Sequence, residues 1–414
     1  MKKFQFTVAA LVVSGLAFGF FASPGRAAED DRAAAIRALA ETVVEKEGHV
    51  GAALAVWYQG ELIFKENWGF ADLDAGNPVT DDTLFFAASI IKPMVGYTTL
   101  VLAEEGKIDL DAPVQTYVPD FPVHESGASP TIRQLLLHRG GIRHYLNSGT
   151  WSESSSASFF DNHYSKANDA LAHWLDIDDE INDFLKAFPE ALPADVRRDF
   201  GNANPYQHVP GERGGYSSFG YTLVAAALEA VEKKSLSLIL QERVFDPFGM
   251  KTAIQPDMRF PIPHYAKSYL YRNLRTGDIA EDKPFRARTL DFSYNAGGGN
   301  LALTISDLIE WGKQFVEGGK ADQSVREMQI SSEITRSDGG RDGYGIGLIQ
   351  DRAGRWIVHN IGASEAYGAS ITIWPEDQLI VASLMNTWPL NVKEGGFYDK
   401  IAKNIGALLL DGNE

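Results

Sequence analysis

Short apolar runs typical of β-strands lie toward both ends of the chain, and runs with helical spacing fill most of the middle. Near the N-terminus, residues 51–59 (GAALAVWYQ) and 61–72 (ELIFKENWGFAD) meet at Gly60, which predicts a β-hairpin. The last third adds four strand-like runs: YGIGLIQD, RWIVHN, GASITIWP and QLIVASLMN. Strands at both ends favour one central antiparallel sheet that both chain ends build and helices cover. The predicted fold class is therefore α+β, with a mostly helical lobe inserted between the two halves of the sheet.

Helical spacing marks the segments expected to cover this sheet. Residues 30–47 carry apolar side chains at helical intervals, which predicts an amphipathic helix. A second helix is expected after Thr83, running to Glu105 and ending at Gly106, a natural C-cap. Four further helices are predicted at 131–145, 221–231, 307–315 and about 398–410. The first of these four is expected to stop at the glycines of 140–141.

The chain has 414 residues, which is long for one compact core and favours a single large domain of two lobes over residues 29–414. We expect a sheet lobe at about 29–110 and 295–414, and a helical lobe at about 111–294. Within the latter, residues 146–215 mix serines, acids and aromatics. They predict helices and loops that line one rim of a cleft, or that only decorate the surface.

The N-terminus has the pattern of a secretory signal peptide over residues 1–28. Lys2 and Lys3 precede an apolar run, which ends in a Pro-Gly pair and small residues. An uncleaved membrane anchor is the alternative. There is no cysteine, so disulfides, thiolate metal sites and a cysteine nucleophile are excluded. The formal net charge of −17 disfavours nucleic acid and anionic membranes as partners. We therefore expect a protein secreted to a bacterial periplasm, without stable membrane association after cleavage.

Candidate chemistry begins with Ser89 and Lys92 at the start of the second predicted helix. Serine is a poor nucleophile unless a base lies within hydrogen-bond reach. Positions i and i+3 of a helix share a face, so the lysine amine can reach the serine hydroxyl. The helix N-terminus would also direct backbone N–H groups at the site. On spacing alone, the signal is weak, and the pair also fits an N-cap serine beside a solvated lysine.

Other catalytic patterns fail. No His-Glu-x-x-His zinc motif, Walker loop or Rossmann glycine pattern occurs, so neither a metal nor a cofactor is expected. His138 and His144 flank a turn without a third ligand nearby and are interpreted as structural. The segment GASEA around Ser364 lacks the second glycine of a nucleophile elbow. The glycines at 297–299 are interpreted as sites of close backbone packing.

Longer segments add a family resemblance. The segment FAASIIKPMVGYTTLVLAEEGKIDLDAPVQTYVPDFP resembles the class C branch of the serine β-lactamase and penicillin-recognising enzyme family. Other segments are similar to further motifs of that branch, in the same order: TIRQLLLHRGGIRHY, PGERGGYSSFGYTLVAAALE, AGGGNLALTISDLIEWG, YGIGL and VHNIGASEAYGASITIWPE. Several runs are closer to the family's mitochondrial members than to its antibiotic-resistance enzymes. The resemblance implies a β-lactamase/transpeptidase-like fold from about residue 40 to the C-terminus.

The resemblance also implies roles. Ser89 would be the acylated nucleophile, Lys92 would deprotonate it, and Tyr216 would be a second base or proton shuttle. Backbone N–H groups of Ser89 and of the strand at Gly362 and Ala363 would bind the oxyanion. These roles describe an exported serine hydrolase without metal or cofactor, acting through an acyl-enzyme on a small molecule or peptide. The carbonyl would belong to a peptide, a D-amino-acid peptide or an ester.

Two departures from the family pattern keep alternatives open. The third motif usually reads basic-x-Gly, but here His359 and Asn360 both precede Ile361-Gly362, so either could occupy the basic position. Ser218 replaces an asparagine that helps to bind the substrate amide, so turnover of β-lactams is less expected. A weakly catalytic binding or scaffold protein, or a true β-lactamase, are the alternative functions. The oligomeric state is left open.

Overall fold

The computed structural model describes residues 24–142, 144, 205–271, 283–287, 292, 295–316, 319–331, 334–336, 339–364, 366–388 and 400–412. Most of the predicted leader (1–28) and of the predicted rim segment (146–215) lies outside the described residues. Among the described helices, none combines the length and the apolar composition needed to span a bilayer.

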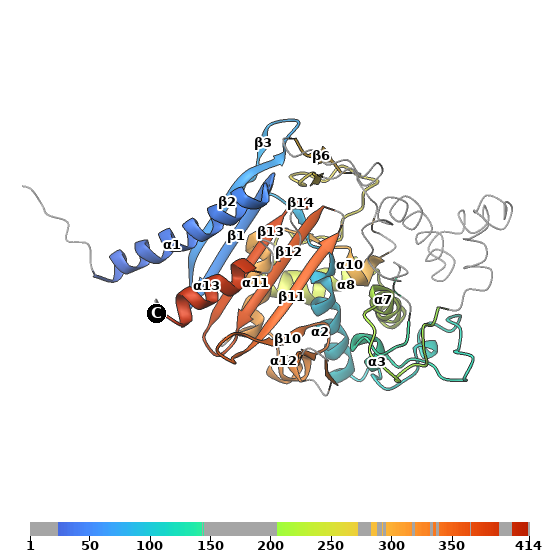
Figure 1. The fold of residues 1–414 in the computed structure, drawn as a ribbon. Coiled ribbons are helices and arrows are strands. Elements are labelled where there is room, and N and C mark those ends of the chain that lie inside the picture. The colour runs from blue at the N-terminus through green and yellow to red at the C-terminus, as the bar shows by residue number, and fades with distance from the viewer. Residues whose placement is uncertain are drawn as a thin grey trace, which may run out of the picture.

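A nine-stranded antiparallel sheet forms the centre, in the order β3-β2-β1-β13-β12-β11-β10-β9-β8 (Figure 1). Its strands are β1 (Gly51–Tyr58), β2 (Glu61–Asp72), β3 (Asn77–Pro78), β8 (Ile334–Thr335), β9 (Arg341–Asp342), β10 (Gly347–Gln350), β11 (Trp356–Ser364), β12 (Tyr367–Trp374) and β13 (Leu379–Met385). β1 pairs with β13, from Ala52 opposite Met385 to Tyr58 opposite Leu379. Strands from both ends of the chain therefore meet in the middle of one sheet, which confirms the predicted fold class.

The predicted hairpin at Gly60 is present. β1 and β2 are joined by Gln59 and Gly60, and both have positive φ, 49° and 96°. Positive φ at both central residues is the condition for the hairpin turn whose twist matches the strands, and glycine adopts it without steric cost. The turn thus fixes the pairing of Tyr58 with Glu61 and of Trp57 with Leu62, and the register shifts between Trp57 and Val56.

One face of the sheet is covered by the first and last helices, α1 (Pro24–Glu47) and α13 (Lys400–Leu410) (Figure 1). α1 begins at Pro24 rather than at residue 30. Ile36 of α1 and Ile401 of α13 pack in one cluster with Leu54 of β1, and all three are fully buried. This face is an apolar layer that both chain ends build together.

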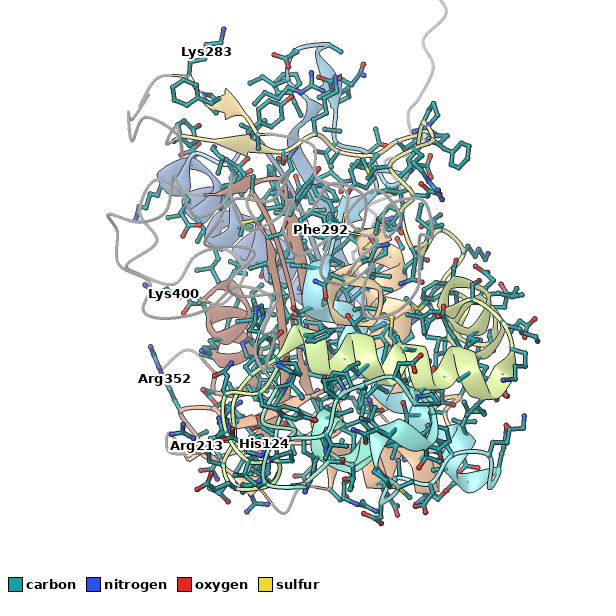
Figure 2. All side chains as sticks on the ribbon, turned by 90° about the vertical axis from the view of Figure 1, so that its right-hand side faces the viewer. His124, Arg213, Lys283, Phe292, Arg352 and Lys400 are labelled. Atoms are coloured by element: carbon teal, nitrogen blue, oxygen red, sulfur yellow. The ribbon has the colours of Figure 1, made fainter. Side chains whose placement is uncertain are left out.

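The other face carries the remaining helices. They are α2 (Ile91–Glu104), α3 (Ile132–Leu136), α7 (Ser218–Glu232), α8 (Leu236–Leu240), α9 (Asp246–Phe248), α10 (Ala296–Gly299), α11 (Ile305–Gly312) and α12 (Gln323–Ile330), with the short helical turns η1 (Ala88–Ile90), η2 (Val114–Thr116), η4 (Gln241–Phe245) and η6 (Lys313–Phe315). Figure 2 shows α7 lying across this side of the molecule. α11 packs against β1, β12 and β13, η1 packs against β11 and β12, and α7 packs on α2, α3 and α10. Two small sheets complete the fold: β4 (Phe85–Phe86) with β7 (Ala302–Leu303), and β14 (Thr387–Trp388) with β5 (Tyr269–Leu270) and β6 (Phe285–Arg286).

α3 is shorter than predicted. A capping box starts it, since the Thr131 hydroxyl accepts from the Gln134 N–H and the Gln134 side chain accepts from the Thr131 N–H. The helix ends at Leu136, and His138 follows in a left-handed conformation with φ of 54°. The helix therefore ends before the predicted stop at Gly140 and Gly141, and the left-handed residue after it is a histidine.

Candidate active site

The segment before Ser89 is held in an unusual conformation. Ala87 donates its N–H to the carbonyl of Leu301 at 2.8 Å, and Ala88 has φ of 46°. A left-handed alanine costs roughly 1–2 kcal/mol, so it persists only where the surroundings impose it. The ring of Phe86 stacks on Phe292, which Figure 2 labels, with 4.5 Å between centroids. Ser89 follows in η1 and lies at the N-terminus of α2.

Gly362 of β11 allows the sheet to approach this segment. A Cβ atom at position 362 would lie 1.9 Å from the carbonyl oxygen of Ala87. Any side chain there would therefore push β11 away from the residues that lead to Ser89. This contact explains why the third motif needs glycine at this position.

The side chains of Lys92 and Tyr216 both reach the hydroxyl of Ser89. Lys92 Nζ lies 2.9 Å from Ser89 Oγ, and the Tyr216 hydroxyl donates to the same oxygen at 2.9 Å. Lys92 Nζ also lies 4.9 Å from the centroid of the Tyr216 ring. The structure thus brings together a hydroxyl and two groups able to accept its proton, from segments 127 residues apart.

Lys92 is buried, with 3% of its surface exposed, and its amine has two further partners. It donates to Ser218 Oγ at 3.0 Å and to the carbonyl of Gly298. A neutral amine can donate to these two groups and still point its lone pair at the Ser89 hydroxyl. The environment of Lys92 therefore suits a base that takes a proton from Ser89.

The backbone around Gly298 has room for no side chain. A Cβ there would lie 2.1 Å from Asn295 Oδ1 and 2.6 Å from the Ser218 carbonyl. The expectation of close backbone packing at 297–299 agrees with this geometry. Sequence reasoning missed its consequence, which is that the Gly298 carbonyl reaches the amine of Lys92.

Tyr216 and Ser218 reach the site through the start of α7. Ser217 is the N-cap, with extended backbone (φ −144°, ψ 114°), and its hydroxyl accepts from the Gly220 N–H at 2.9 Å. Side chains two positions apart along extended backbone point to the same side. Both neighbours of Ser217 therefore face Lys92.

Burial and charge shift the two candidate bases. Burial lowers the pKa of the Lys92 amine, because the charged form loses its hydration, and Tyr216 opposes that shift. For Tyr216, burial acts against ionisation, but the charge of Lys92 and hydrogen bonds to Lys92, Ser89 and Ser218 outweigh it and lower the pKa of the phenol. Over the whole Tyr216 residue, 51% of the surface remains exposed. Lys92 therefore makes the Tyr216 phenol easier to ionise, whereas Tyr216 favours the charged form of Lys92.

Two histidines that the sequence indicated as structural lie against Tyr216. The ring centroids of His138 and Tyr216 are 4.5 Å apart, and those of His144 and Tyr216 are 5.5 Å apart. Burial, followed by the charge of Lys92, lowers the pKa of His138 to about 3 and that of His144 to about 4. No sequence pattern signalled these contacts, since His138 lies 78 residues before Tyr216.

The two candidates for the third motif face opposite sides of the sheet. Ile357 packs in the α1–α13 cluster and Val358 in the cluster that contains α2, so alternation puts His359 on the α1–α13 side. There His359 Nδ1 lies 2.9 Å from Thr372 Oγ1, its cross-strand neighbour. Asn360 lies on the Ser89 side and donates to the Gly345 carbonyl at 3.1 Å. The structure therefore does not bring His359 to Ser89, and it places Asn360 on the correct face.

Ala363 is exposed and follows Gly362 on β11, opposite Gly368 of β12. A role for its N–H in an oxyanion hole stays a prediction. Among the described residues, no group of three or more His, Asp or Glu side chains is arranged to hold a metal ion.

A serine and a lysine that meet at a helix N-terminus, beside an antiparallel sheet, are typical of a known class of protein. The Beta-lactamase family model matches residues 36–402, so the chain belongs to the beta-lactamase family.

Three relatives illustrate the range of this family. The mitochondrial serine beta-lactamase-like protein of Homo sapiens is 28% identical in an alignment that covers 68% of this chain and 56% of the relative. The esterase EstB of Burkholderia gladioli is 26% identical over 85% of this chain and 89% of its own length. A D-aminopeptidase of Gluconobacter oxydans is 25% identical over 80% of this chain and 54% of the relative. The chain thus spans little more than half of the human relative.

Solved structures share the fold. The octameric penicillin-binding protein homologue from Pyrococcus abyssi superposes with a TM-score of 0.69 and 21% identity, over 92% of this chain and 78% of the other. A class C beta-lactamase superposes with a TM-score of 0.66 and 16% identity, over 94% of this chain and 98% of the other. The fold is therefore of the β-lactamase/transpeptidase type.

Proposed function

We propose that this protein is a serine hydrolase that forms an acyl-enzyme on Ser89. The observation that carries the proposal is the convergence of Lys92 Nζ and the Tyr216 hydroxyl on Ser89 Oγ, each at 2.9 Å. A nucleophile within hydrogen-bond reach of a base is the arrangement that serine catalysis needs. Related proteins named as an esterase and a D-aminopeptidase support the same reaction class.

In the proposed reaction, Ser89 Oγ attacks the substrate carbonyl carbon and passes its proton to Lys92. The carbonyl π electrons move to oxygen, and N–H groups of Ser89 and of the strand at Gly362 and Ala363 stabilise the oxyanion. Collapse of this intermediate expels an alcohol or amine, which takes a proton delivered through Tyr216. Water then attacks the acyl-serine ester, gives up one proton to the same bases and releases the acid. Ser89 regains its proton from Lys92 or Tyr216.

The proposed substrate is a small molecule or peptide with an ester or D-amino-acid amide carbonyl. Ser218 supports this choice over β-lactams, because its short hydroxyl is 3.0 Å from Lys92 and replaces the family's longer carboxamide. Asn360 lies on the same side of the sheet and is the proposed group of the third motif. A panel of p-nitrophenyl esters, D-amino-acid amides and nitrocefin ranks the three classes, and faster nitrocefin turnover than ester or amide turnover would contradict this choice.

The test of the reaction class is covalent labelling with a fluorophosphonate, followed by intact-protein mass spectrometry. We expect one adduct on the wild type, none on Ser89→Ala, and one adduct on the control Ser364→Ala. The control removes the serine of the rejected GASEA elbow. A folded wild type without an adduct would overturn the proposal and favour the binding or scaffold function.

We also propose export to a bacterial periplasm, on the basis of the leader pattern over residues 1–28 and the lack of cysteine. Cell fractionation and the intact mass of the recovered protein test this part. We expect a periplasmic species that lacks the leader. A full-length species in the membrane fraction would support the anchor instead.

A further inference from the structure

His138 makes three separate contacts with the segment that carries Tyr216. Its carbonyl accepts the Gly215 N–H at 2.8 Å, and its Nδ1 accepts the Ser217 N–H at 3.2 Å. Its ring lies against the Tyr216 ring, with 4.5 Å between centroids. One residue therefore binds the backbone on both sides of Tyr216 and packs on the side chain between them.

The backbone of His138 is strained in the conformation that permits these contacts. Its φ of 54° lies in the left-handed region, where glycine is the usual residue. An L-residue there costs roughly 1–2 kcal/mol, although histidine tolerates the conformation better than most. Glycines lie nearby at 140 and 141, yet the left-handed position itself is occupied by a residue with an imidazole side chain. Strain of this kind is found where the surrounding structure needs a particular side chain.

The second side of His138 is also fixed. Its ring centroid lies 5.1 Å from that of Tyr221 of α7, and the Tyr221 hydroxyl donates to the Leu136 carbonyl at 2.6 Å. This contact joins the end of α3 to the first turn of α7. Since Nδ1 accepts a hydrogen bond, a neutral ring carries its proton on Nε2. A neutral ring adds no second positive charge beside Lys92.

We propose that His138 is a positioning residue: it holds the Tyr216 phenol at hydrogen-bond distance from Ser89 Oγ. The inference rests on the proposed function. In this proposal His138 does not contact the substrate, and His138 affects the reaction only through Tyr216. A displacement of a reacting group by about 1 Å costs up to roughly 100-fold in rate.

The test is a double-mutant cycle that uses the rate constant for fluorophosphonate labelling of Ser89, per titrated active site. We expect His138→Ala to slow labelling about 10- to 100-fold in the wild-type background, and less than about 2-fold in the Tyr216→Phe background. Loss of general stability would lower both backgrounds equally, so the cycle separates positioning from a purely structural role. Equal losses in the two backgrounds, or no loss in the first, would overturn the proposal.

Two further variants keep the test decisive. His138→Asn retains an acceptor and tolerates the left-handed backbone, so it replaces His138→Ala in the cycle if that variant does not fold. We expect it to lose less rate than His138→Ala, because it keeps a side-chain acceptor for the Ser217 N–H in addition to the backbone carbonyl contact that both variants retain. His264→Asn is the matched control, since His264 is exposed and also left-handed, with φ of 59°. Its labelling rate should equal that of the wild type.

Absence of labelling on the folded wild type would remove the proposed function and this inference together. A labelled wild type with an additive cycle would remove only the inference.

Discussion

The two faces of the central sheet use buried polar groups in different ways. On the α1–α13 face, buried hydroxyls pair with their own cross-strand neighbours, as Ser370 does with Ser383 at 3.0 Å. On the α2 face, Lys92 is bound by groups from separate elements, Ser218 at the start of α7 and Gly298 of α10. Neighbouring hydroxyls that hydrogen-bond to each other have no adjacent base to activate them. An amine that several elements enclose is held out of water, so its pKa falls and it is more readily neutral and able to accept a proton.

The difference has an energetic origin. Burying an unpaired ammonium is far more costly than burying a hydrogen-bonded hydroxyl, so the protein lowers the pKa of the amine instead of leaving it fully charged. The α1–α13 face carries no comparable penalty, since Leu54, Ile36 and Ile401 gain from leaving water. Both faces bury apolar side chains, so substitutions on the α1–α13 face should change stability alone, whereas substitutions around Lys92 should change reactivity.

The largest expected effect comes from Lys92→Met, which keeps the buried volume and removes the base. We expect labelling of Ser89 to fall about 10²–10⁴-fold, the range for loss of a general base. Lys65→Met is the control, because Lys65 forms an ion pair with Asp81 at the surface. Stopped-flow labelling measures both, and a loss for Lys92→Met no greater than for Lys65→Met would place the base elsewhere.

On the opposite face, Leu54→Ala should affect stability alone. Leu54 is fully buried, so we expect the free energy of unfolding to fall by about 2–5 kcal/mol. Denaturant titration measures this loss, while the labelling rate per active site should stay within about 2-fold of the wild type. A large change in that rate would show that the two faces are coupled more strongly than their contacts indicate.

The pH dependence of labelling sharpens the comparison further. The Lys92 amine must be neutral to accept a proton, so the rate should rise with pH to a plateau. The midpoint should lie below 10.5, the ordinary pKa of lysine, since burial lowers it. Tyr216 raises the pKa of Lys92, so in Tyr216→Phe the midpoint should move to lower pH. Tyr206→Phe is the control, and an upward shift in Tyr216→Phe would contradict the proposed coupling.

The smallest effect is expected at the two residues of the third motif. His359→Gln should change the labelling rate less than about 2-fold and stability by about 1 kcal/mol or less, because its partner Thr372 lies on the α1–α13 face. Asn360→Ala should slow labelling more, since Asn360 binds Gly345 on the Ser89 side. A larger loss of labelling rate for His359→Gln than for Asn360→Ala would indicate that His359, and not Asn360, acts at the site.

Local features were predictable because short-range rules govern them. The Gly60 turn and the positive φ of 70° at Gly106, just after the C-cap of α2 at Glu105, follow from turn and capping chemistry. The joining of both chain ends in one sheet follows from the need to bury strand faces in layers. The sequence did not indicate that α3 would end at Leu136, nor that His138 beyond it would contact the Tyr216 segment. That contact becomes visible only when α3 and α7 are packed.

The same division runs through the site. The sequence by itself determined the class of chemistry through the ordered series of family motifs, and it placed Ser89 and Lys92 three positions apart, where helical geometry lets them meet. Only the tertiary structure decided what surrounds them: the Gly298 carbonyl on Lys92, His138 against Tyr216, and Asn360 rather than His359 on the inner face. These are contacts between distant segments, or the outcome of a strand register. One residue of register exchanges the two faces of a strand, and packing of the whole sheet selects it.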